Sequence, residues 1–231
     1  MRPQLLDFDE NSTIEVNSAD PAKLEKTLVI ACGALAREAL AVFEANKLEQ
    51  FDITCLPAKL HGSPMQIPER VRDKIRQHKK DYSRILCLYG DCGTNGALDR
   101  VLREEGVERI AGDHCYAFFA GLETYKQMDE DQFGTFFLTD FLVRHFEAFF
   151  LKDLKLDKYP EILDMIFGNF QRLVFLQQIP DPELRAKAVA IAARLKLPLE
   201  FADTGIGGVQ SFLAAGNAGA LTPAETSAVR R

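Results

Sequence analysis

The sequence lacks several patterns by which a function is usually recognised. No two of its five cysteines have the Cys-x-x-Cys spacing of zinc ribbons and thioredoxin-like redox sites. It has neither the full glycine fingerprint of dinucleotide-binding folds nor a phosphate-binding P-loop. The net charge of −6 argues against a basic nucleic-acid-binding face. The place of each reactive side chain in the fold is therefore the main guide to function.

Long apolar segments are also missing. No uninterrupted apolar run reaches the roughly 18 residues of a membrane span. Residues 1–20 contain acids where a signal peptide has a basic and then an apolar segment. We therefore expect a cytoplasmic protein with a small-molecule substrate and with neither a nucleic-acid nor a membrane partner. In a reducing compartment its cysteines are thiols, metal ligands or catalytic groups rather than disulfides.

The apolar pattern predicts an α/β protein. Continuous apolar runs, typical of strands buried on both faces, alternate with helical patterns. This alternation predicts a doubly wound, mostly parallel sheet (Rossmann-like) with helices on both faces. We expect an N-terminal arm at 1–24, a single α/β domain at 25–215 and a flexible tail at 216–231. The predicted strands occupy residues 27–32, 51–57, 84–90, 107–112, 134–139, 172–179 and 198–203. The strand order around residues 133–176 stays open.

Three cysteines stand just beyond predicted strand ends and just before predicted helices: Cys32, Cys92 and Cys115. In open α/β sheets, ligands bind outside the carboxyl ends of the strands. A helix N-terminus also lowers the pKa of a neighbouring thiol. We therefore expect these three thiols to share one site. Cys55 and Cys87 lie within apolar strand runs and are predicted to be core residues.

Three thiolates with one open position suit zinc or a [4Fe–4S] cluster. His61 and Asp91 are the predicted proton carriers of such a centre. The fourth ligand stays open among these two residues, Asp113 and His114.

Three further features have separate interpretations. The glycine-rich stretch with Thr204, Gly205 and Gly207 could hold an anion with backbone N–H groups, or form only a tight turn. The phenylalanine-rich segment 133–150 is predicted to be core, although it could also line a pocket. His78, on a charged helix face, is predicted to be solvated.

Five stretches in this order resemble a known family: "ACGAL", "LHGSP", "YGDCG", "GDHCYAFFAG" and "TFFLTDFLVRHF". They are similar to prokaryotic proteins of the domain of unknown function 1638 (DUF1638), over about 27–212. The family pattern includes cysteines like Cys32, Cys92 and Cys115, and a histidine like His61. Its members often occur beside corrinoid proteins and trimethylamine-type methyltransferases. The resemblance therefore implies a role in one-carbon metabolism, with a corrinoid protein or a methyltransferase as a partner.

Three functions follow from these observations. The first is a metal-centre protein, either an enzyme or an accessory to a methyltransferase. The second is a corrinoid- or small-molecule-binding module without turnover. The third is a metal-free cysteine enzyme of the racemase type, because "ACGAL" loosely resembles the first motif of aspartate/glutamate racemases. However, "DCGTN" lacks the Thr-His that usually follows their second cysteine.

Overall fold

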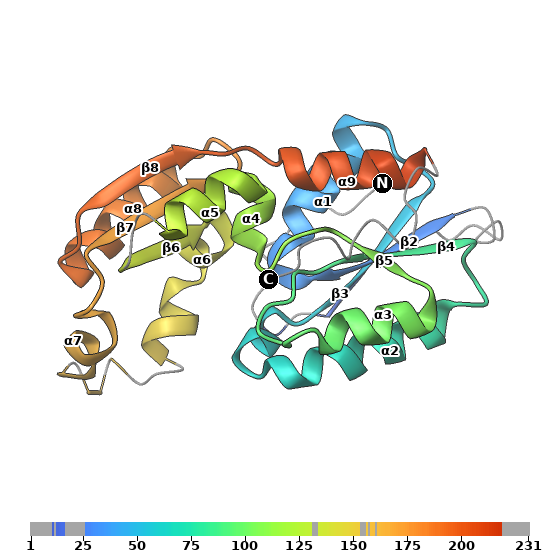
Figure 1. The fold of residues 1–231 in the computed structure, drawn as a ribbon. Helices are drawn as coiled ribbons and strands as arrows, with labels where there is room; N and C mark the ends of the chain where they lie inside the picture. Colours follow the sequence, from blue (N-terminus) through green and yellow to red (C-terminus); the bar gives the residue numbers. More distant parts are fainter. Residues whose placement is uncertain are drawn as a thin grey trace. The chain divides into compact units, whose positions relative to one another are not determined.

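The computed structural model describes residues 11, 13–16, 26–130, 134–152, 156, 158–159 and 161–218. These residues fall into two compact units. Unit 1 comprises the chain up to Phe118 together with the part from Gly208 onward, and unit 2 comprises Phe119–Gly207. Each unit has its own sheet, so the strands expected in one sheet are divided between two (Figure 1).

Unit 1 contains a five-stranded sheet with the order β1-β3-β2-β4-β5. β1 pairs antiparallel with β3, and the other pairs are parallel. The strands are β1 (Ile14–Val16), β2 (Thr27–Cys32), β3 (Phe51–Leu56), β4 (Arg84–Leu88) and β5 (Glu108–Arg109). The helices are α1 (Ala36–Ala45), α2 (Ile67–His78), α3 (Ala97–Glu105), α4 (Cys115–Ala120) and α9 (Gly207–Asn217), with short 3-10 turns at Gly33–Leu35, Ala58–Gly62 and Pro64–Gln66.

Helices cover both faces of this sheet, as the doubly wound pattern requires. α2 and α3 lie on one face, and α1 and α9 lie on the other (Figure 1). Alternate side chains of β2 divide between the two faces, and Leu28 and Ile30 pack against Val71 of α2 and Leu98 of α3. All four of these side chains are fully buried. This double cover explains why the strands read as continuous apolar runs.

Unit 2 contains a parallel three-stranded sheet with the order β6-β7-β8. One face carries a core that includes Phe175 of β7, Val143 of α6 and Ala188 of α8. On the other face, Tyr125 of α5 contacts Phe137 of β6 at 5.7 Å between ring centroids. The elements are α5 (Leu122–Glu130), β6 (Thr135–Thr139), α6 (Asp140–Arg144), a π-helical turn (Glu147–Lys152), α7 (Glu161–Phe167), β7 (Arg172–Gln177), α8 (Pro182–Leu195) and β8 (Leu199–Asp203).

The α/β prediction with mostly parallel strands is confirmed. The expected arm at 1–24 contains strand β1, which pairs with β3 through Ile14 and Cys55. α9 extends to Asn217, beyond the expected start of the tail at 216, and residues 219–231 lie outside the described part of the chain. The prediction that His78 is solvated is wrong: it is 8% exposed and contacts the Tyr82 ring edge-on. None of the described helices has the length and apolar character needed to cross a bilayer.

Candidate metal centre

The candidate residues of unit 1 lie on the loops that follow its four parallel strands. β2 lies between β3 and β4. The chain therefore passes from β2 to β3 on one side and then crosses to β4 on the other side. In doubly wound sheets the crevice at this topological switch point is the usual ligand site. Here the switch point lies between the ends of β2 and β4. Cys32 ends β2, and Cys92 lies in the loop after β4. The fold therefore places both thiols where a ligand is expected.

The loop that carries Cys92 has an unusual backbone. Cys92 itself has φ of 50°, and its neighbours Gly93 and Gly96 have φ of 83° and 77°. A left-handed conformation costs a non-glycine residue about 1–2 kcal/mol. The glycines adopt it without this steric cost. Backbone strain of this kind concentrates at functional sites, so the geometry of Cys92 supports a role for this loop.

Asp91 holds this loop in shape. Its carboxylate accepts hydrogen bonds from the Thr94 hydroxyl (2.6 Å) and from the backbone N–H groups of Asn95 (3.0 Å) and Gly96 (2.8 Å). These bonds lower its pKa, although partial burial acts in the opposite direction. The carboxylate therefore has its hydrogen bonds within the turn that precedes helix α3. We infer that Asp91 positions Cys92 rather than carrying protons.

The loop after β5 lies directly against the Cys92 loop. The Cys92 N–H donates to the Asp113 carbonyl at 2.8 Å. Gly90 makes this approach possible, because a Cβ there would lie 3.0 Å from the Asp113 carbonyl oxygen and 3.1 Å from the His114 Cα. The two loops that carry Cys92 and His114 are therefore fixed to each other through backbone contacts.

Arg109 holds the loop after β5 in place through hydrogen bonds. Its side chain is 7% exposed, and its guanidinium donates to the carbonyls of Ile110 (2.8 Å) and Gly112 (2.9 Å). It also forms a two-pronged ion pair with Asp99, at 2.5 and 3.1 Å. Arg109 thereby joins the segment leading to His114 to helix α3, which follows the Cys92 loop.

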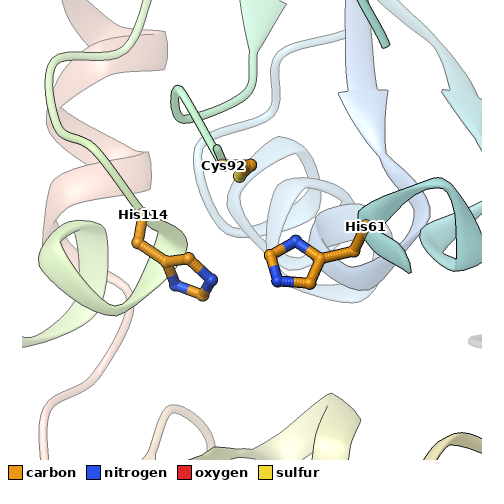
Figure 2. A group of neighbouring side chains, drawn as sticks. All are labelled: His61, Cys92 and His114. Carbon is orange, nitrogen blue, oxygen red and sulfur yellow. The ribbon is translucent and has the colours of Figure 1, made fainter. Parts of the chain in front are cut away.

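Three potential ligand atoms meet at this edge of the sheet. One ligand atom each of His61, Cys92 and His114 lies within 4.8 Å of the others. The two imidazoles point toward each other from opposite sides, with the Cys92 thiol beside the gap between them (Figure 2). Their ring centroids are 5.1 Å apart at 84°. Cys115 adjoins this group, with its Sγ 3.4 Å from His114 Nδ1.

Burial keeps the group electrically neutral near pH 7. It raises the pKa of Cys92 to about 12 and that of Cys115 well above its ordinary value. Burial also lowers the pKa of His61. The pKa of His114 is lowered to about 3, mainly by burial and in addition by the charge of the nearby His61. Neither a thiolate nor an imidazolium is therefore favoured in the protein alone. A bound metal cation would supply the positive charge that stabilises a thiolate.

The predicted site residues have different places in the structure. The three predicted cysteine ligands lie close to one another. A negative charge on Cys32 or on Cys92 would raise the pKa of Cys115. Only the His61, Cys92 and His114 group reaches ligand spacing among the described residues, so the three-cysteine ligand set stays a prediction. The prediction that Cys55 and Cys87 are core residues is confirmed, because both are fully buried.

The predicted anion-binding stretch belongs to unit 2. The N–H groups of Thr204 and Gly205 both point at the Gln177 carbonyl, at 2.9 and 3.3 Å. The Thr204 hydroxyl donates to the same oxygen at 3.1 Å. These donors are engaged within the protein, and Gly205 adopts φ of 65°. The geometry of Thr204 and Gly205 fits the alternative interpretation of this stretch as a tight turn, and Gly207 is the first residue of α9.

Sequence reasoning named His114 only as one of several fourth ligands and did not name Arg109 or Tyr89. The Tyr89 hydroxyl is buried and has no hydrogen-bond partner among the described residues. Tyr89 directly follows an apolar strand, and Arg109 interrupts one. A polar side chain at such a position was the available signal.

Comparisons with known proteins give one family. The model described as "Protein of unknown function (DUF1638)" matches residues 55–213. The chain belongs to this family. The DUF1638 match includes His61, Cys92, His114 and Cys115, and begins after Cys32.

Other comparisons add no functional argument. No curated protein matches the chain. A solved structure, the lipase/esterase from Lactobacillus plantarum, is 10% identical, with coverage of 91% of this chain and 99% of that chain. Its TM-score of 0.27 is too low to support any inference.

Proposed function

We propose that the protein binds a transition-metal ion through His61, Cys92 and His114, and that zinc is the preferred metal. The supporting observation is the approach of their three ligand atoms to within 4.8 Å at the switch point of the sheet. In a tetrahedral zinc site, Zn–S of about 2.3 Å and Zn–N of about 2.0–2.1 Å put neighbouring ligand atoms about 3.3–3.6 Å apart. The ligand atoms therefore need to approach one another by at most about 1.2–1.5 Å.

The donor types favour zinc over magnesium or calcium, which prefer oxygen ligands. Three protein ligands with a free position are typical of a catalytic zinc. Such an ion acts as a Lewis acid and activates a bound thiol or water. His61, which is the exposed member of the group, lies where a small-molecule substrate would approach.

The proposed setting is one-carbon metabolism with a corrinoid protein or a methyltransferase as partner. This part of the proposal depends only on the family resemblance. The metal-free cysteine enzyme is a weaker alternative, because burial raises the pKa of these thiols and so disfavours the thiolate nucleophile.

Elemental analysis of anaerobically purified protein tests the metal directly. We expect stoichiometric zinc in the wild type and its loss in Cys92→Ala and His114→Ala. Cys87→Ala is the matched control, because it removes a fully buried thiol from the strand that leads to the same loop. Zinc that persists in both site variants, or a wild type without bound metal, would refute the proposal. A brown protein containing iron and sulfide would favour the cluster instead.

A further inference from the structure

The imidazole of His114 is held by the two residues that follow it, at the start of α4. Its Nδ1 accepts a hydrogen bond from the Tyr116 N–H at 3.4 Å. The Tyr116 ring packs against the imidazole, with ring centroids 3.9 Å apart at 44°. Nδ1 is on the side of the ring away from His61 and Cys92, so the other nitrogen, Nε2, faces the gap between the proposed ligands (Figure 2).

This arrangement decides which nitrogen of His114 carries the proton in the metal-free protein. A backbone N–H can only donate, so Nδ1 presents its lone pair to Tyr116. The single proton of the neutral imidazole is then on Nε2. A metal ion binds the lone pair of a ring nitrogen, and the nitrogen that faces His61 and Cys92 is Nε2. Metal binding therefore requires that Nε2 lose its proton and that Nδ1 carry it instead.

A proton on Nδ1 needs an acceptor, and Cys115 is in position to provide one. The Tyr116 N–H cannot accept a hydrogen bond. The Cys115 Sγ lies 3.4 Å from Nδ1, and a sulfur atom is a weak acceptor. The second nitrogen of a metal-binding histidine usually donates to an outer partner of this kind, which fixes the tautomer and the orientation of the ring. Cys115 itself lies outside the group that reaches ligand spacing.

We propose that zinc binding changes the tautomer of His114 from Nε2–H to Nδ1–H, and that Cys115 is the positioning residue that accepts a hydrogen bond from Nδ1–H. The inference rests on the proposed zinc binding and adds an outer partner to its three ligands. The imidazole stays neutral, because Nε2 releases one proton to solvent and Nδ1 takes up one. Cys115 acts through His114 and not on the metal, so the fourth position of the zinc remains free for a substrate.

Nitrogen NMR of protein labelled with ¹⁵N-histidine reads the tautomer directly, and His114→Gln identifies the signals of His114. We expect the proton on Nε2 in chelator-treated wild type and on Nδ1 after zinc loading. A proton on Nδ1 before zinc is added, or an unchanged tautomer after loading, would overturn the inference. This measurement needs no variant of Cys115.

Zinc titration and X-ray absorption test the role of Cys115. Cys115→Ala removes the acceptor, and we expect it to bind zinc about 10–100-fold more weakly than the wild type. Cys115→Ser keeps an acceptor and should bind within about threefold of the wild type. The number of sulfur atoms bound per zinc should be the same in the wild type and in Cys115→Ala. Unchanged affinity in Cys115→Ala, or a sulfur ligand lost with Cys115, would overturn the inference alone. A wild type that binds no zinc would overturn the proposed function and this inference together.

Discussion

Replacement of Cys92 by glycine and by alanine tests the left-handed backbone on which the site depends. Both variants remove the thiol, so both should lose metal. They differ in how well they tolerate φ of 50°. We expect metal-free Cys92→Gly to be more stable than metal-free Cys92→Ala, the reverse of the usual order at an ordinary backbone position.

The magnitude follows from two opposing effects. The left-handed conformation costs alanine about 1–2 kcal/mol that glycine avoids. Glycine in turn loses about 0.5–1 kcal/mol more than alanine through backbone entropy. The difference should therefore favour glycine by about 0.5–1 kcal/mol.

The matched control is the same pair of substitutions at Cys32. This residue is also half-buried, but it has φ of −67° and ψ of 137°, an extended conformation that suits alanine. There we expect Cys32→Ala to exceed Cys32→Gly by about 0.5–1 kcal/mol. The contrast between the two positions, about 1–2 kcal/mol, measures the cost of the left-handed backbone.

Urea unfolding of chelator-treated protein, followed by circular dichroism, gives the four stabilities. The metal must be removed first, since ligand binding adds its own stabilisation to the folded state. If alanine is preferred at both positions, Cys92 does not have the left-handed conformation, and its loop carries no backbone strain.

Three further predictions concern the supports of the site. Gly90→Ala should destabilise the protein by about 1–3 kcal/mol and weaken zinc binding, because the added Cβ would press on the loop before His114. The control is Gly62→Ala, whose added Cβ would meet no atom within 4 Å, and it should bind zinc normally in the same titration. Arg109→Lys keeps the charge but loses the planar fork, so we expect a loss of about 2–4 kcal/mol by urea unfolding and 10–100-fold weaker zinc binding. The same change at Arg72, which pairs with the exposed Glu69 and Glu104 and more distantly with the buried Glu105, should cost under about 1 kcal/mol. Because the pKa of His114 is lowered to about 3, the unfolded chain binds one more proton than the folded protein between about pH 6.5 and 3. As pH falls through this range, the free energy of unfolding of metal-free wild type should decrease by up to about 1.4 kcal/mol per pH unit more than that of His114→Gln. Equal pH profiles would contradict the burial of His114.

The sequence was sufficient to predict the class of fold but not the division into two sheets. The strands at 135–139 and 172–177 have the same apolar character as those at 27–32 and 84–88. Apolar periodicity reports burial, and it contains no information about which strands pair. The separation depends on packing between distant segments. For example, Gly208 lets α9 approach the Phe118 carbonyl, where a Cβ would lie too close.

The site was predicted through the rule that strand ends carry ligands. That rule selected His61, Cys92 and Cys115 without any local motif. It did not distinguish His114 from its neighbours, because the predicted strand at 107–112 is followed by four consecutive polar or reactive residues, 113–116. Which of their side chains points into the site depends on the loop backbone. The role of Asp91 had a sequence signal: an aspartate followed by Thr, Asn and Gly is typical of a turn that caps its own backbone.

Several features of this edge oppose stability, and they occur together. Cys92 has a strained backbone, Gly90 is confined by the neighbouring loop, and two histidines with lowered pKa values face each other. Cys92 is a half-buried side chain that packs against the core beneath the sheet edge. Local strain of this kind is common where a site is preorganised for a ligand. A soft cation would relieve the two electrostatic costs at once, because it favours the thiolate and uses the neutral imidazoles as donors.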